Sequence, residues 1–131
     1  MKIHNIWSDQ PPTKPRILFD FGNGSGAISF IPYEALFKKF FDYTVINNID
    51  FSNPNHKCGA EYIQKHWTEI NHKYFSTFDI CFFFDGDCDR VLCRVKGREQ
   101  LWDGNSSLGL YLLVLMKMKE QLSGEIKHKL K

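Results

Sequence analysis

The sequence has little net charge, no long hydrophobic run and no apolar segment at its start. Its 17 basic and 15 acidic side chains leave a formal charge of +2, which does not favour nucleic acid or an anionic membrane as a partner. The longest apolar stretch, residues 108–116, is far shorter than the roughly 20 residues that cross a bilayer. Residues 1–15 lack the apolar run of a signal peptide. We therefore expect a soluble, cytoplasmic protein.

Cysteines are few, and none of them stand in a C-x-x-C spacing. A small disulfide scaffold would need more cysteines in a loop-rich chain, so we expect Cys58, Cys81, Cys88 and Cys93 to be reduced thiols. The length of 131 residues suits one domain, and its 43% of apolar residues supplies one packed core. This composition excludes wholesale disorder and a fibrous repeat.

The chain divides by composition into three segments. Residues 1–15 contain three prolines and are typical of a linker-like lead-in. Residues 16–122 carry the alternating pattern of an α/β domain, and residues 123–131 form a basic tail that we expect to be frayed. No internal repeat is present.

In residues 16–122, some apolar segments have the spacing of strands and others have the spacing of helices. Strands are predicted at residues 17–21, 43–49, 78–84 and 91–95, and helices at residues 32–41, 59–70 and about 107–122. Alternating strands and helices favour a largely parallel sheet, but residues 85–90 are too few for a crossover helix, so the last two strands should be antiparallel. We predict a three-layer α/β/α sandwich with a mixed, mostly parallel four-stranded sheet. The last helix is apolar on most sides and should pack on the sheet or on another domain.

Three carboxylates at alternate positions, Asp85, Asp87 and Asp89, follow the most apolar predicted strand. Carboxylates this close repel one another unless a cation lies between them, and an all-oxygen set favours Mg²⁺. Gly86 frees the backbone to curl so that the carboxylates can converge. Arg90 would place a guanidinium beside the ion, suited to a phosphate. Metal and arginine together indicate phosphoryl-transfer chemistry.

Other interpretations of these residues are weaker. An EF-hand loop begins with the same D-x-D-x-D pattern, but its sixth and twelfth positions should be glycine and glutamate, and here they are Arg90 and Lys96. A solvated acidic turn between two strands remains the plain structural alternative. His56, Cys58, His66 and His72 match no standard zinc spacing and are interpreted as surface or structural residues.

A second glycine-rich segment follows the first predicted strand. Residues 22–27 satisfy G-x-G-x-x-A, the pattern of a dinucleotide-binding turn, and Asp42 stands about 20 residues on as a possible ribose contact. Glycine clusters are also common in tight strand-to-helix turns, so both interpretations stay open.

Several motifs, in order along the chain, resemble the α-D-phosphohexomutases, the family of phosphoglucomutase and phosphomannomutase. The segment FDGDCDR at residues 84–90 closely resembles that family's metal-binding loop. LFDFGNGSG at residues 18–26 looks like the strand and turn that open its second domain, and FSNPNH at residues 51–56 resembles its middle loop. DGN at residues 103–105 resembles the turn before its final helix, although the family usually has an acidic residue at the position of Asn105.

The resemblance implies the second domain of a four-domain enzyme that moves a phosphoryl group between the 1- and 6-positions of a hexose phosphate. Asp85, Asp87 and Asp89 would then hold Mg²⁺ against a phosphoserine of the first domain, and Arg90 would contact phosphate. No serine loop of the T-A-S-H-N-P type occurs in these 131 residues, so we expect them to be inactive alone. A noncatalytic relative that binds phosphate ligands or a protein is the alternative. We also expect exposed apolar surface that drives self-association.

Overall fold

The computed structural model describes residues 13–70 and 72–129. Residues Lys14–Gly104 form one compact unit, which contains the sheet and most helices, and the chain from Asn105 onward belongs to a second unit. Each unit is described by itself. The predicted boundary at residue 122 stays a prediction.

Four strands form one mixed sheet in the order β2-β1-β3-β4. Their bounds are Arg16–Asp20 for β1, Asp42–Ile46 for β2, Ile80–Phe84 for β3 and Val91–Val95 for β4. β1 lies between β2 and β3 and is parallel to both, whereas β3 and β4 are antiparallel. The predicted mostly parallel four-stranded sheet is therefore confirmed. β1 and β3 end side by side, so the loops that follow them meet at one edge of the sheet.

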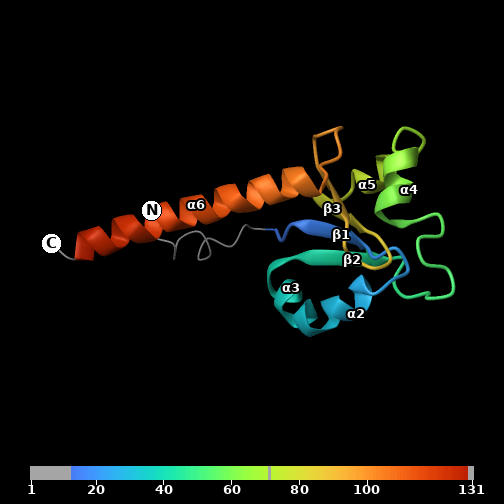
Figure 1. The fold of residues 1–131 in the computed structure, drawn as a ribbon, viewed down its shortest axis with the longest axis horizontal. Helices are drawn as coiled ribbons and strands as arrows, with labels where there is room; N and C mark the ends of the chain where they lie inside the picture. Colours follow the sequence, from blue (N-terminus) through green and yellow to red (C-terminus); the bar gives the residue numbers. More distant parts are fainter. Residues whose placement is uncertain (1–12, 71, 130–131) are drawn as a thin grey trace. The chain divides into compact units, whose positions relative to one another are not determined.

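Each face of the sheet is covered by its own group of helices (Figure 1). Leu18 and Phe83 point to the face covered by α4 (Gly59–His66) and α5 (His72–Phe75). Alternate residues of the same strands point to the opposite face and pack against α2 (Gly26–Phe30) and α3 (Glu34–Phe40), together with Phe21, which follows β1. The strand residues are Ile17, Phe19, Phe82 and Phe84. Because side chains alternate along a strand, one nearly continuous apolar run can supply two cores. The α/β/α layering is confirmed.

Some predicted bounds were wrong, and the local sequence explains why. The predicted helix at residues 32–41 is instead α2 (Gly26–Phe30), a 3₁₀ turn η1 (Ile31–Tyr33) and α3 (Glu34–Phe40). Pro32 lies at the start of η1, where its missing N–H interrupts one continuous helix. The helix predicted to reach residue 70 ends at His66, and α5 follows it as a short, separate helix.

Helix α6 (Gly104–Lys129) is longer than the predicted helix at residues 107–122. The predicted frayed tail is thus helical as far as residue 129. Several apolar side chains of α6 are exposed, including Leu108, Leu112 and Met116. The expected packing of this helix on the sheet or on another domain stays a prediction. Among the described residues, no helix is long and apolar enough to cross a membrane.

Asp79 stands just before β3 and joins three strands at the edge opposite the acidic loop. Its Oδ2 accepts a hydrogen bond from the Arg16 N–H (2.8 Å), and Lys96 Nζ lies 3.3 Å from its Oδ1. The Arg16 hydrogen bond is the largest cause of a lowered Asp79 pKa, and Lys96 adds to it. The ionised side chain is therefore the form that stabilises the fold.

We predict that Asp79→Asn makes folding less sensitive to acid. A pKa lowered in the folded chain gives stability that is present above the ordinary value of 3.8 and is lost as the pH falls through the folded value. The wild type should therefore exceed Asp79→Asn in the free energy of unfolding at neutral pH, and the gap should shrink in acid. Urea unfolding at several pH values measures it, with the exposed Asp42→Asn as control; a gap independent of pH would contradict the prediction.

Candidate metal centre

The acidic loop connects β3 to β4 and brings three carboxylates together. Asp85 directly follows β3, the Cys88 N–H donates to its carbonyl oxygen (3.0 Å), and the loop returns as β4. One carboxylate oxygen each from Asp85, Asp87 and Asp89 lies within 4.8 Å of the others. Among the described residues, no other group of three or more acidic, histidine or cysteine side chains converges in this way. The predicted convergence of these three residues is therefore seen.

Asp85 is buried and paired with Arg90. Its side chain is 1% exposed, while that of Arg90 is 60% exposed. Arg90 Nε donates to Asp85 Oδ2 at 2.6 Å, and the backbone N–H of Arg90 donates to Oδ1 at 3.1 Å. Burial raises the pKa of Asp85, but these hydrogen bonds and the guanidinium charge outweigh it and hold the pKa below its ordinary value. Asp85 is thus an ionised ligand candidate even without a metal.

Asp87 and Asp89 are exposed on the outer side of the loop. The charge of Asp87 is the largest cause of a raised Asp89 pKa, and Asp85 adds to it. This raised pKa records the repulsion that a cation would relieve. Three carboxylates with no soft ligand suit a hard ion such as Mg²⁺. The residues present therefore fit the metal that the sequence predicted.

Cys88 lies inside the loop, and its thiol does not change this conclusion. Burial, followed by the charges of the three aspartates, raises the pKa of Cys88 above its ordinary value. The sulfur therefore stays protonated at neutral pH and is a poor metal ligand. All four cysteines are free, as predicted.

Arg90 was predicted to contact phosphate. Its guanidinium lies beside the cluster, with Nε 3.7 Å from Asp89 Oδ1 and one terminal nitrogen 3.9 Å from Glu61 Oε2 on α4. The sequence pattern did not predict that Glu61 would lie here. Since Nε is used by Asp85, a phosphate would meet the two terminal nitrogens; this role stays a prediction.

The glycine-rich turn after β1 packs directly against the acidic loop. The Ser25 N–H donates to the Gly86 carbonyl at 2.9 Å. A Cβ on Gly24 would lie only 2.0 Å from that same carbonyl oxygen, so the backbones approach too closely for any side chain. The glycines of this turn are explained by contact with protein.

The dinucleotide interpretation gains no support from this geometry. The N–H groups of Gly24 and Ser25 already donate to the carbonyls of Phe21 and Gly86, so they do not face a pyrophosphate. Asp42 pairs with Arg16 at the beginning of β1, at the edge of the sheet opposite the turn. It cannot meet a ribose held at Gly24.

Asp20 is a buried carboxylate that sequence analysis did not single out. Its oxygens accept hydrogen bonds from the backbone N–H groups of Gly22 (2.9 Å) and Gly59 (3.2 Å). Burial raises its pKa, and these bonds and one from Asn47 only partly oppose that rise. An acidic residue ending a buried apolar strand was the available signal. Asp20 ties the start of α4 to the turn that supports the acidic loop.

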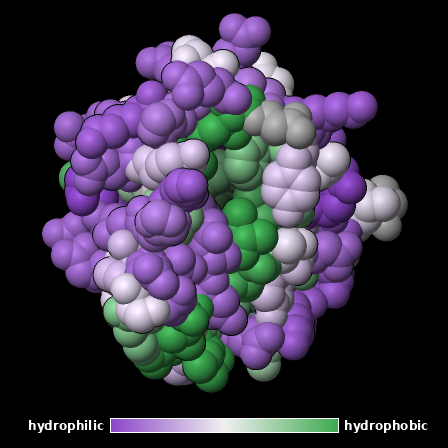
Figure 2. Space-filling model, turned by 90° about the vertical axis from the view of Figure 1, so that its right-hand side faces the viewer, coloured by the Kyte–Doolittle hydropathy of each residue, from purple (hydrophilic) through white to green (hydrophobic). Residues whose placement is uncertain are grey.

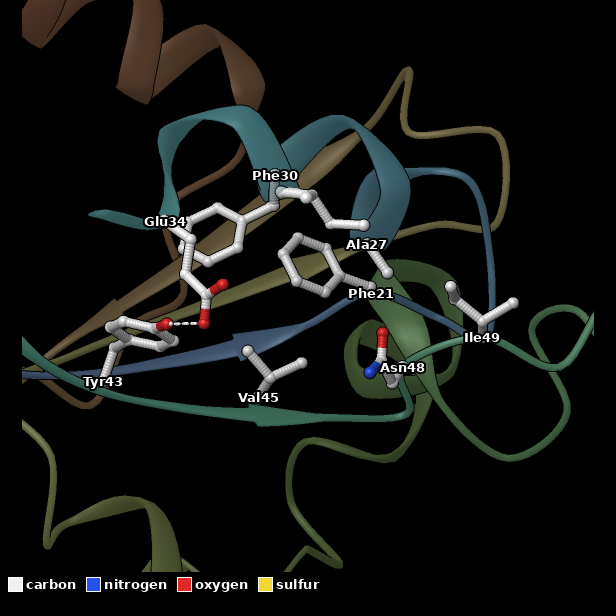
Figure 3. A pocket seen from close by; sticks show the side chains of 9 residues that line it. Phe21, Ala27, Phe30, Glu34, Tyr43, Val45, Asn48 and Ile49 are labelled. Carbon is white, nitrogen blue, oxygen red and sulfur yellow. Dashed lines mark hydrogen bonds between the residues drawn. The ribbon is translucent and has the colours of Figure 1, made fainter. Parts of the chain in front are cut away.

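Hydrophilic residues dominate the face that carries the carboxyl ends of the strands, with a strip of hydrophobic residues between them (Figure 2). A separate pocket of about 170 Å³ lies between α2, α3 and β2 (Figure 3). Its charged lining residue, Glu34, is engaged by the Tyr43 hydroxyl (2.5 Å) and by Lys38 (2.9 Å). This pocket offers no metal ligand set.

Comparison with known proteins points the same way as the acidic loop. No family model matches the chain. It is similar to the phosphoacetylglucosamine mutase of Candida albicans, with 29% identity over 119 residues, or 81% of this chain and 21% of that protein. The mouse and human enzymes of the same name are 27% and 29% identical over 70% and 56% of this chain, and 18% and 14% of their own lengths. The chain is weakly homologous to a phosphosugar mutase.

These relatives are members of the α-D-phosphohexomutase family, which the sequence motifs resemble. The chain spans about a fifth of their length or less. The homology therefore relates this chain to one part of these enzymes.

We predict that Gly24→Ala destabilises the unit Lys14–Gly104. The new methyl group would overlap the Gly86 carbonyl, which belongs to backbone and cannot swing away, so the free energy of unfolding should fall by about 2 kcal/mol or more. Gly104→Ala is the matched control, because a Cβ there meets nothing within 4 Å. Urea unfolding measures both variants. Equal stability of Gly24→Ala and the wild type would show that the two loops are not in contact.

Proposed function

We propose that this chain is the Mg²⁺-binding domain of a phosphohexomutase, an enzyme that transfers a phosphoryl group between the 1- and 6-positions of a hexose phosphate. The observation that carries the proposal is the convergence of Asp85, Asp87 and Asp89 at the carboxyl end of β3. The similarity to phosphoacetylglucosamine mutases supports the reaction class and favours an N-acetylated amino sugar phosphate as the substrate. The rest of such an enzyme would supply the phosphoryl-carrying serine and the sugar contacts.

The three aspartates and Arg90 would have different roles in this domain. Asp85, Asp87 and Asp89 would hold the ion, which when bound neutralises negative charge on a phosphoryl group. Arg90 holds Asp85 ionised through its Nε. Its side chain is 60% exposed beside the cluster, and one terminal nitrogen lies 3.9 Å from Glu61 Oε2. A phosphate there would receive hydrogen bonds from a fixed, planar donor. The chemistry of this domain is positioning and electrostatic stabilisation, so we expect no mutase turnover from the chain alone.

Asp87→Asn tests the metal site. Calorimetric titration of the wild-type chain with Mg²⁺ should show weak binding, with a Kd of about millimolar, because three carboxylates leave ligand positions to water. Asp87 is exposed, so the variant should fold normally and raise the Kd about tenfold or more. Asp42→Asn removes one exposed acidic group outside the loop and should leave the Kd unchanged. Equal Kd values for the wild type and Asp87→Asn would contradict the metal site.

A phosphate monoester provides the second arm of this experiment. A phosphoserine peptide should raise the Mg²⁺ affinity of the wild type, because its oxygens complete the coordination shell and meet Arg90. The unphosphorylated peptide should have no effect. Metal binding that is indifferent to the phosphopeptide would favour a metal-binding module without a role in phosphoryl transfer.

A further inference from the structure

Asn55 connects the two loops that form the candidate metal centre. It lies in the segment between β2 and α4, 31 residues before Gly86 in the sequence. Its side-chain Oδ1 accepts a hydrogen bond from the Gly86 N–H at 2.8 Å. Its own backbone N–H donates to the carbonyl of Gly22, also at 2.8 Å. One residue therefore bridges the glycine turn and the middle of the acidic loop.

The space around the Asn55 amide is fixed by glycines. A Cβ on Gly22 would lie 3.2 Å from Asn55 Oδ1, and a Cβ on Gly59 would lie 3.1 Å from the same atom. A Cβ on Gly86 would lie 3.1 Å from Asn55 Nδ2. Asn55 itself has φ 60°, a left-handed conformation in which asparagine is several-fold enriched among residues other than glycine. Its amide is held in one orientation although the residue as a whole is exposed.

Gly86 is held at both of its peptide groups. Its N–H belongs to the peptide that joins it to Asp85 and is bound by Asn55. Its carbonyl belongs to the peptide that joins it to Asp87 and accepts from the Ser25 N–H at 2.9 Å. The directions of these two peptide planes determine where the flanking aspartates point. We infer that Asn55 is a positioning residue for the metal centre, acting through the Gly86 peptide; this inference rests on the proposed function.

A purely structural role would give a different result from a positioning role. The Asn55–Gly86 hydrogen bond lies at the surface, so its loss should change the global stability little, whereas a misplaced aspartate would weaken metal binding directly. Asn55→Gly removes the acceptor and still allows the left-handed backbone. Asn53→Gly makes the same change two residues away, where the side chain bonds to Asp50 and not to the acidic loop.

The experiment combines three measurements on the full chain. Amide hydrogen exchange by NMR should show the Gly86 N–H protected in the wild type and exchanging about tenfold faster in Asn55→Gly. Mn²⁺ titration followed by electron paramagnetic resonance should show a Kd raised about tenfold in Asn55→Gly and unchanged in Asn53→Gly. Urea unfolding should place both variants close together in stability.

Each outcome decides between the inference and its alternatives. A Gly86 N–H that exchanges freely in the wild type would overturn the inference without any variant, including the case in which Asn55→Gly fails to fold. Full Mn²⁺ affinity in a folded Asn55→Gly would overturn the inference while leaving the proposed function intact. No Mn²⁺ binding by the wild type would overturn the proposed function, and the inference with it.

Discussion

The close approach of two backbones at the carboxyl ends of β1 and β3 is the constraint on which the candidate site depends. β1 and β3 are adjacent and parallel, so the turn after one and the acidic loop after the other meet at the same edge. The Gly86 carbonyl occupies the place that a Cβ on Gly24 would need. Only a glycine turn allows this contact, and the contact gives the acidic loop a support on its inner side.

Two carboxylates are buried at this edge, and the fold stabilises them in different ways. Asp20 receives the N–H groups of Gly22 and Gly59, and burial still leaves its pKa raised. Asp85 receives a guanidinium as well as a backbone N–H, and its pKa is lowered. Asp20 therefore ties two backbone segments together at a site where burial disfavours its charged form, whereas the charge of Asp85 is favoured by Arg90. Because Arg90 compensates that charge, the buried Asp85 is stabilised in the acidic loop without a cation.

The sequence predicted those features that depend on local pattern. The apolar composition around Phe82 and Phe84 predicted β3, and alternation predicted the bounds of β4. The short link between β3 and β4 predicted that these two strands are antiparallel. The three aspartates were also evident, since alternate acids after a buried strand are unusual. Helix bounds were less accurate, because Pro32 divides a continuous apolar pattern and α5 is held by packing of Phe75 in the core.

The contacts that position the site could not be predicted, because they join residues distant in sequence. Asn55 and Gly86 are 31 residues apart, and Asp20 and Gly59 are 39 apart. Nothing in the composition of the segment at residues 51–56 indicates that one of its asparagines, and not its neighbour, turns toward the acidic loop. These residues meet because β1 and β3 are adjacent and parallel, so that the loops after both strands lie at one edge of the sheet.

On the proposed function, metal binding by this chain would be a property of its tertiary structure, although the three aspartates lie within five residues. Free in solution, the segment from Asp85 to Arg90 would have to overcome both the repulsion among its carboxylates and the entropy of fixing its backbone. In the folded unit, Asn55 and Ser25 fix the two peptides of Gly86, and Arg90 compensates the most buried charge. Folding therefore offsets the entropy of fixing the loop backbone and part of the carboxylate repulsion, through hydrogen bonds that do not require an ion. A cation bound there would relieve the remaining repulsion between Asp87 and Asp89, which water already screens in part.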